Sequence, residues 1–207
     1  MRWVALFLTL LLGVALAVLV VELRRPIEIA ESVTIEAPVE EVWSYLGDSG
    51  NARQWSVFFH HIAPLDSLDG RLGAERRCFR NPDRSGIRWD ETVIALVPHR
   101  ERRIHVYNLA GFALPRADRS EFETRQLYER PSPGTTRLTF TAELREPRDL
   151  LTRLLFRLTR SETERIFRRN LANIKAAVEQ KDAYKRLHDW EPTNFVDGRS
   201  AGGVSVR

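Results

Sequence analysis

Residues 27–43 read IEIAESVTIEAPVEEVW, and this stretch predicts a β-strand that is followed directly by a helix. Four apolar residues of the first half share one parity, with mainly polar residues between them, as a half-buried strand requires. They are Ile27, Ile29, Val33 and Ile35. Pro38 ends the strand and suits the first turn of a helix, where its missing N–H is not needed. The sequence therefore predicts a strand over 27–35 and a short helix after it.

Further elements follow in close order. A second short helix is expected over residues 51–59, and six strand-like segments come after it. They lie near residues 62–68, 74–80, 88–97, 103–109, 121–128 and 136–144. Turn sequences such as Asp69-Gly70 separate them, and the short connections indicate an antiparallel meander. A long helix is predicted from about residue 148 to 187, with one apolar stripe facing the protein.

This order of elements defines an α+β fold class. A curved antiparallel sheet of about seven strands would wrap around the long C-terminal helix and leave a cavity between them. Alternation and helical spacing select five candidates for the cavity wall. Four of them enter the predicted ligand site, Phe122, Phe140, Phe167 and Leu171, and the fifth is Tyr128. For each of them the alternative is ordinary packing in the core.

Residues 35–43 resemble the opening signature of the polyketide cyclase/dehydrase branch of the START-like (SRPBCC, helix-grip) superfamily. Later segments are similar to the same pattern in order and spacing, over about residues 27–182. They are Trp55-Ser56, Trp89-Asp90-Glu91, the GTTRL of residues 134–138, and Asn173-Ile174-Lys175 followed by Glu179. The resemblance implies a helix-grip fold whose hydrophobic tunnel binds lipids, sterols, polyketides or other apolar molecules. It does not by itself imply catalysis.

The N-terminus carries an apolar segment, because residues 3–21 contain no charged side chain. As a helix this segment would span roughly 28 Å, about one hydrocarbon core. We expect a transmembrane anchor over residues 1–23, a helix-grip domain over 24–188 and a polar tail over 189–207. A cleaved signal peptide is the alternative, with Ala15-Leu16-Ala17 as its cleavage site. Arg24 and Arg25 favour a cytoplasmic position for the domain.

Composition limits the classes of partner. The net charge is +4, and 29 of the 32 basic residues are arginines scattered among 28 acids, so a nucleic-acid interface is not expected. The single cysteine excludes an intramolecular disulfide. His60 and His61 would point to opposite faces of a strand, so no metal site is predicted. No cofactor and no oligomeric state are predicted either.

Glu91 is the acid most suited to chemistry. It shares strand parity with Trp89, and Arg76 on the preceding strand could pair with it. Inside the cavity Glu91 could orient a ligand hydroxyl or act as a general acid or base. On the opposite face it would be a surface ion pair. The Gly47–Gly50 sequence GDSG resembles the nucleophile loop of serine proteases, but no histidine precedes it, so a turn is predicted.

Four more residues complete the predicted ligand site: Trp55, Phe59, Cys78 and Tyr107. The first two end the second helix, and the others are placed by strand parity, which for Tyr107 leaves both faces open. The segment 149–158 (DLLTRLLFRL) is predicted as the start of the long helix, with an interfacial helix at a bilayer as the alternative.

The resulting hypothesis is a single-pass membrane protein whose domain binds a hydrophobic small molecule, more in keeping with a carrier than an enzyme. Two alternatives remain. One is a cyclase/dehydrase that acts on a polyketide-like or aromatic substrate. The other is a protein-interaction module whose cavity is filled by its own side chains.

Overall fold

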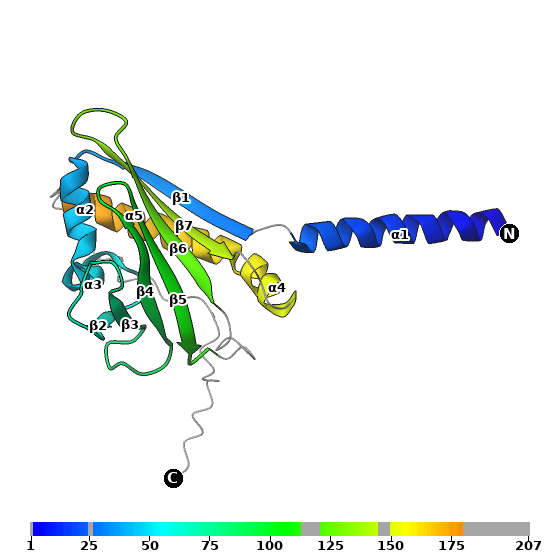
Figure 1. Cartoon of the computed structure of the whole chain (residues 1–207), viewed down its shortest axis with the longest axis horizontal. Helices are drawn as coiled ribbons and strands as arrows, with labels where there is room; N and C mark the ends of the chain where they lie inside the picture. Colours follow the sequence, from blue (N-terminus) through cyan, green and yellow to red (C-terminus); the bar gives the residue numbers. More distant parts are fainter. Residues whose placement is uncertain (1, 25–26, 113–120, 145–149, 180–207) are drawn as a thin grey trace, which may run out of the picture.

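The computed structural model describes residues 2–24, 27–112, 121–144 and 150–179. Its centre is one antiparallel sheet of seven strands that curves around a helix (Figure 1). The strands are β1 (Ile27–Ile35), β2 (His61–Pro64), β3 (Glu75–Phe79), β4 (Arg88–Val97), β5 (Glu101–Ala110), β6 (Phe122–Glu129) and β7 (Thr136–Leu144). Their order in the sheet is β1-β7-β6-β5-β4-β3-β2. The predicted α+β class and seven-stranded sheet are confirmed.

The first and last strands of the sequence lie side by side. β1 pairs with β7 from Ile27 opposite Leu144 to Ile35 opposite Thr136. Each of the other strands pairs with its neighbour in the sequence. The meander therefore returns to its start, and the inward side chains of all seven strands share one concave face.

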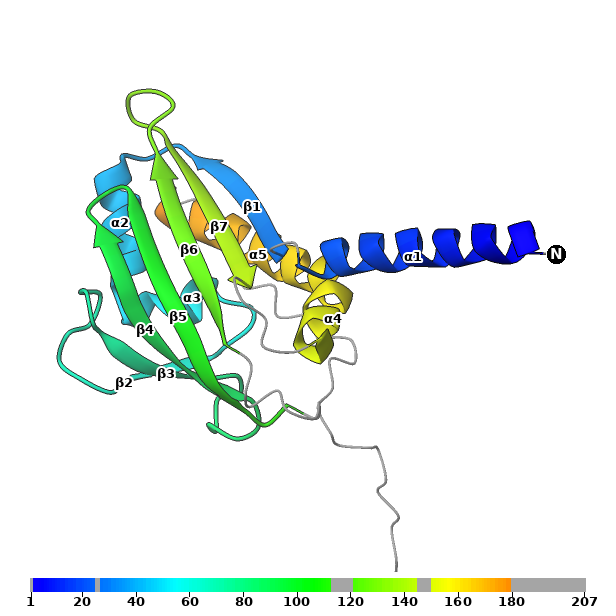
Figure 2. The same cartoon turned by 45° about the vertical axis from the view of Figure 1, so that its right-hand side comes forward.

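Short helices close one end of this face (Figure 2). They are α2 (Val39–Gly47), the 3₁₀ helix η1 (Ser49–Asn51) and α3 (Ala52–Trp55). α2 begins after Pro38, as predicted, and buries Val39, Val42 and Leu46. The helix predicted over 51–59 is shorter, because Ser56 is extended and its Oγ accepts hydrogen bonds from the backbone N–H groups of Phe58 and Phe59.

The prediction of one continuous C-terminal helix is wrong. Two helices are present, α4 (Leu150–Leu158) and α5 (Arg160–Val178). Thr159 between them has φ −88° and ψ 1°, and its carbonyl accepts hydrogen bonds from the N–H and hydroxyl of Thr163. The change of direction lets Phe156 of α4 meet Phe122 of β6, with ring centroids 6.0 Å apart. The predicted ends of this helix, 148–149 and 180–187, lie outside the described residues.

The N-terminal helix α1 (Arg2–Arg24) extends away from the sheet in both views (Figures 1 and 2). Its side chains are water-exposed where they are described, for example Trp3 at 84% and Leu12 at 71%. Within the described residues, no helix combines the length and the apolarity needed to cross a membrane, so the predicted span is not supported. The predicted tail, 189–207, lies outside the described part of the chain.

The main core lies between α5, α2 and the concave face of the sheet. α5 buries Leu171, Ile174 and Val178 in it, which confirms the predicted apolar stripe. β1 and β7 contribute Ile35 and Leu138 to the same cluster. Anchored in this way, α5 leaves its N-terminal half to face the open part of the sheet.

Two glycines with positive φ differ in their surroundings. Gly111, just after β5, has φ +82°, and a Cβ there would lie 2.4 Å from the carbonyl oxygen of Gly86. Gly134, in the β6–β7 turn, has φ +76° and no heavy atom within 4 Å of a Cβ position. Both positions disfavour L-residues, but only Gly111 holds two backbone segments in close approach.

We expect Gly134→Ala to cost about 1 kcal/mol of unfolding free energy, the usual cost of a left-handed conformation. Gly111→Ala should cost several times as much, because its methyl group would also push the chain away from Gly86. Urea unfolding of the full chain, followed by tryptophan fluorescence, measures both. Equal costs would show that the close approach does not constrain the fold.

Candidate functional site

A cavity of about 280 Å³ lies between the concave face of the sheet, α4, the N-terminal half of α5 and the segment after α3. Aromatic side chains dominate its wall: Trp55, Phe58, Phe59, Trp89, Phe112, Phe122, Phe140, Phe156 and Phe167. Ile104, Val106 and Leu109 of β5 add aliphatic surface. Such a wall suits an apolar guest, for which a few polar groups fix the orientation.

Several aromatic rings of the cavity wall contact one another, some pairs of them edge to face. The ring centroids of Trp55 and Phe140 are 6.1 Å apart, and those of Phe140 and Phe167 are 5.9 Å apart. Phe58 lies 5.1 Å from Trp89 at an interplanar angle of 32°. These contacts join α3, β4, β7 and α5, so the wall comes from distant parts of the sequence.

Two asparagines of α5 hold the segment that carries the first three aromatics. Asn173 Nδ2 donates to the carbonyl of Trp55 at 3.0 Å, and Asn170 Oδ1 accepts from the N–H of Val57 at 2.9 Å. Both asparagine residues are buried. The bonds therefore set the positions of Trp55, Phe58 and Phe59 relative to α5.

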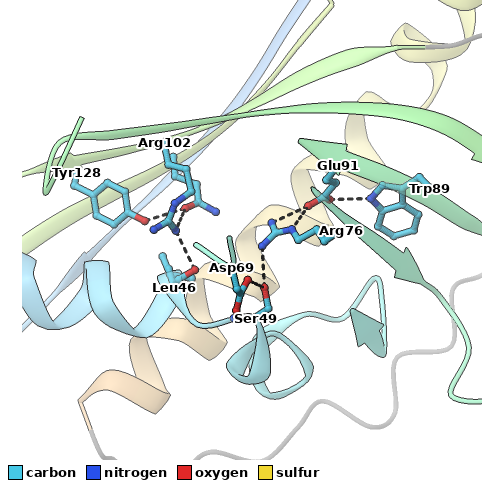
Figure 3. A network of polar contacts seen from close by, with 9 residues as sticks. Leu46, Ser49, Asp69, Arg76, Trp89, Glu91, Arg102 and Tyr128 are labelled. Atoms are coloured by element: carbon cyan, nitrogen blue, oxygen red, sulfur yellow. Dashed lines mark hydrogen bonds and ion pairs between the residues drawn. The ribbon is translucent and has the colours of Figure 1, made fainter. Parts of the chain in front are cut away.

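A buried ion pair interrupts the apolar wall (Figure 3). Arg76 Nε and Nη2 lie 2.8 and 2.7 Å from Glu91 Oε2, and Trp89 Nε1 donates to Glu91 Oε1 at 2.8 Å. The side chains of Arg76 and Glu91 are 14% and 10% exposed. β3 and β4 place these two residues directly opposite each other. Glu91 therefore lies inside the cavity, as one of the two predicted alternatives requires.

The ion pair continues away from the cavity into a polar chain. Arg76 Nη1 donates to Ser49 Oγ at 3.4 Å, and the Ser49 hydroxyl donates to Asp69 Oδ1. Burial acts to lower the pKa of Arg76, but Glu91 together with Cys78 and Asp69 outweighs it, and the pKa is raised. Ser49 lies in η1 and links Arg76 to Asp69 by hydrogen bonds. A short turn-like element at this place agrees with the prediction of a turn at 47–50.

Arg102 forms a second buried network. Its Nη1 donates to the Leu46 carbonyl at the end of α2 and to Gln126 Oε1, which also accepts from the Tyr128 hydroxyl (Figure 3). The guanidinium lies 4.6 Å from the centroid of the Trp43 ring. Burial lowers the pKa of Arg102 and raises that of Tyr128. Arg102 therefore joins α2 to β5 and β6.

Seven of the ten predicted ligand-site residues line the cavity: Trp55, Phe59, Trp89, Glu91, Phe122, Phe140 and Phe167. The other three do not. Tyr107 is on the convex face, where its hydroxyl accepts from Thr92 Oγ1, because the inward side chains of β5 are Arg102, Ile104 and Val106. The contribution of any of these residues to binding stays a prediction.

Cys78 and Leu171 belong to the packed core instead of the wall. Cys78 is fully buried opposite Trp89, and its pKa is raised well above the usual value by burial and then by Glu91. Leu171 lies on the side of α5 that faces β1, beside Val33.

Several residues that line the cavity were not predicted from the sequence. Phe58 lies three residues after the end of α3, and Phe156 is in α4, whose direction the sequence did not predict. Thr163, Ile166 and Asn170 precede or follow Phe167 at helical spacing, a signal that could have found them. Within the described residues, no group of three or more His, Cys, Asp or Glu side chains could hold a metal ion.

We expect Glu91→Ala to destabilise the fold by about 3–5 kcal/mol, because it leaves a buried guanidinium and an indole N–H without their acceptor. The double variant Arg76→Met with Glu91→Leu should cost much less, since neither charge remains. Glu40→Ala is the matched control, because its pair with Arg130 is exposed (56% and 59%) and should be worth less than about 1 kcal/mol. Urea unfolding compares the three variants. If Glu91→Ala were as stable as the Arg76/Glu91 double variant, an unpaired buried charge would not be the cause of the loss.

Solved structures of other proteins have a similar fold. A solved protein from Arthrobacter aurescens matches with a TM-score of 0.59 and 14% identity over 79% of this chain and 92% of its own. DynU16, a putative protein in the dynemicin biosynthetic locus, matches with a TM-score of 0.55 and 17% identity over 77% of this chain, which spans about half (49%) of DynU16. Norcoclaurine synthase from Thalictrum flavum, solved as a point mutant with a transition-state analogue, matches with a TM-score of 0.54 and 11% identity. The match covers 75% of this chain and 96% of the synthase chain. At such identities the likeness concerns the fold.

No curated protein matches the sequence. A family model does, however, and it is described as polyketide cyclase / dehydrase and lipid transport. It matches residues 26–179, which include all seven strands, α5 and every residue of the cavity wall. The helix-grip architecture implied by the sequence is thereby confirmed, and the chain belongs to the polyketide cyclase/dehydrase and lipid transport family.

Proposed function

We propose that this protein binds a hydrophobic small molecule in the cavity between the sheet and α5. The observation that carries the proposal is an aromatic-lined space of about 280 Å³ inside the fold. Apolar surface removed from water contributes about 25 cal/mol per Å², so a guest that fits this wall gains affinity without any ion pair of its own. The family, in which lipid transport is one of the described roles, supports the same reading.

The cavity bears on both alternative functions, the interaction module and the cyclase/dehydrase. An interaction module with a filled interior is not favoured, because the side chains leave the space open. A cyclase/dehydrase needs ionisable groups that are free to exchange protons with the substrate. Glu91, the predicted acid or base, already has both oxygens bonded by Trp89 and Arg76. We therefore favour a binding function over an enzymatic one.

Native mass spectrometry of the full chain, isolated from a lipid-containing host extract, tests the proposal. We expect a reproducible mass excess that is lost in Ala142→Phe, because Ala142 lines the cavity and a benzyl group would fill part of it. Thr139→Phe is the matched control on the same strand, since Thr139 is not among the described residues that line the cavity. A mass excess that survives Ala142→Phe, or none in any form, would count against a ligand in this cavity.

We further propose that α1 places the domain at a membrane, on the cytoplasmic side. The support is physical: residues 3–21 carry no charge, and the described side chains of α1 are exposed instead of packed on the domain. A helix of this kind is costly to keep in water. Arg24 and Arg25 follow it, and basic residues favour the cytoplasmic side.

Alkaline carbonate extraction of membranes tests this anchor. The full chain should stay in the pellet, and Leu12→Arg with Leu16→Arg should move it to the supernatant, because each buried arginine costs about 2.5–3.5 kcal/mol at a bilayer centre. Leu65→Arg with Leu72→Arg is the control, since these domain leucines are also exposed and the added charge is equal. A parent chain found in the supernatant would rule the anchor out. Digestion by protease only after cell lysis is the outcome expected for a cytoplasmic domain.

A further inference from the structure

We infer that the ligand of this cavity is a neutral apolar molecule of about two fused rings that carries one hydroxyl group, and that this hydroxyl binds the Arg76–Glu91 pair. The inference rests on the proposed function, because it names the class of molecule that the same cavity takes. It follows from the size of the cavity, the position of the ion pair and the balance of charges on the wall.

The volume of the cavity limits the size of the guest. About 280 Å³ is close to twice the roughly 150 Å³ of an engineered protein cavity that holds benzene. It lies just below the range of about 300–1,000 Å³ that is usual for small-molecule sites. A molecule of two fused rings fits this space, and the edge-to-face rings of Trp55, Phe140 and Phe167 offer it aromatic contacts.

The buried position of the Arg76–Glu91 pair costs desolvation free energy. Removing two charges from water is repaid only in part by their attraction, and apolar replacements of a buried pair are often neutral or stabilising. Arg76 and Glu91 nevertheless occupy a wall that is otherwise mainly aromatic and aliphatic. In an apolar pocket, such placed polar groups are the ones that orient a ligand.

Charge balance then selects a neutral polar group. The cavity wall holds three arginines and three glutamates among the described residues: Arg76, Arg80, Arg125, Glu91, Glu121 and Glu162. Glu162 pairs with Arg165, as Glu91 pairs with Arg76. A carboxylate on the ligand would be attracted by Arg76 but repelled by Glu91, and an ammonium group the reverse, so neither charge gains a net attraction from the pair.

A hydroxyl group satisfies both members, because it can donate one hydrogen bond and accept others. Glu91 receives one N–H on Oε1 and two on Oε2, and a carboxylate has about four acceptor positions. The Cys78 thiol beside it is only a weak donor. A ligand hydroxyl is therefore the stronger partner for the remaining position on Oε1.

Calorimetric titration of the full chain, with an amphipol covering α1 and empty amphipol as the blank, tests the inference. The probes share one ring system: 2-naphthol, naphthalene, 2-methoxynaphthalene and 2-naphthoate. We expect 2-naphthol to bind about tenfold tighter than naphthalene, as a hydrogen bond to a charged group allows. The methyl ether cannot donate and should lose this preference, and 2-naphthoate should bind more weakly than naphthalene.

Two double variants locate the effect. Arg76→Met with Glu91→Leu should reduce the preference for 2-naphthol to about onefold while naphthalene still binds. The control is Arg77→Met with Asp90→Leu, which removes the neighbouring ion pair on the same two strands and on the opposite face of the sheet. This control should keep the tenfold preference.

The outcomes separate the two proposals. Naphthalene that binds as tightly as 2-naphthol, or 2-naphthoate that binds most tightly, would overturn the hydroxyl and leave the apolar cavity in place. Loss of the preference in the Arg77/Asp90 control as well would also overturn it. Failure of all four probes to bind would contradict the proposed function itself. The comparison among probes needs no variant, so it decides the question even where a variant does not fold.

Discussion

The site depends on how α5 holds the segment between α3 and β2. Before His60, whose N–H donates to the Phe79 carbonyl of β3, this segment has no partner strand. It carries Phe58 and Phe59 of the cavity wall, and Trp55 ends α3 directly before it. Asn170 and Asn173 supply one acceptor and one donor to its backbone, at positions two residues apart. Buried backbone groups without such partners are costly. The two asparagines thus satisfy the segment and at the same time fix the width of the cavity.

Much of the sheet could be predicted from alternation and turn residues. β1, β4 and β7 begin and end at the predicted residues, because most of their inward positions are apolar and most of their outward positions are polar. β5 shows the limit of this cue. It places Arg102 inward and Tyr107 outward, which reverses the usual pattern. The reason is tertiary, since the Leu46 carbonyl at the end of α2 and the ring of Trp43 receive the Arg102 guanidinium.

The C-terminal helices show a second limit. Helical spacing found Phe167, Leu171 and Ile174, yet it could not tell the cavity side of α5 from the core side. Nor could it find the break at Thr159, because threonine occurs in helices and no proline or glycine marks the place. The break follows from packing, since Phe156 meets Phe122 only when α4 departs from the axis of α5. Seven of the ten predicted site residues lie on the wall. Of the other three, Tyr107 was misplaced by strand parity and Leu171 by helix face, and Cys78 is on the inward face but packed in the core.

The position of Cys78 has a practical consequence for spectroscopy. It is the one cysteine of the chain, it is fully buried, and its raised pKa keeps the thiol protonated at neutral pH. Thiol reagents attack the thiolate, so this residue is a poor target in the folded protein. A cysteine introduced on the convex face would then be the single reactive thiol. Spin labels or fluorophores can be attached there, and distances within the fold followed, without first removing the native cysteine.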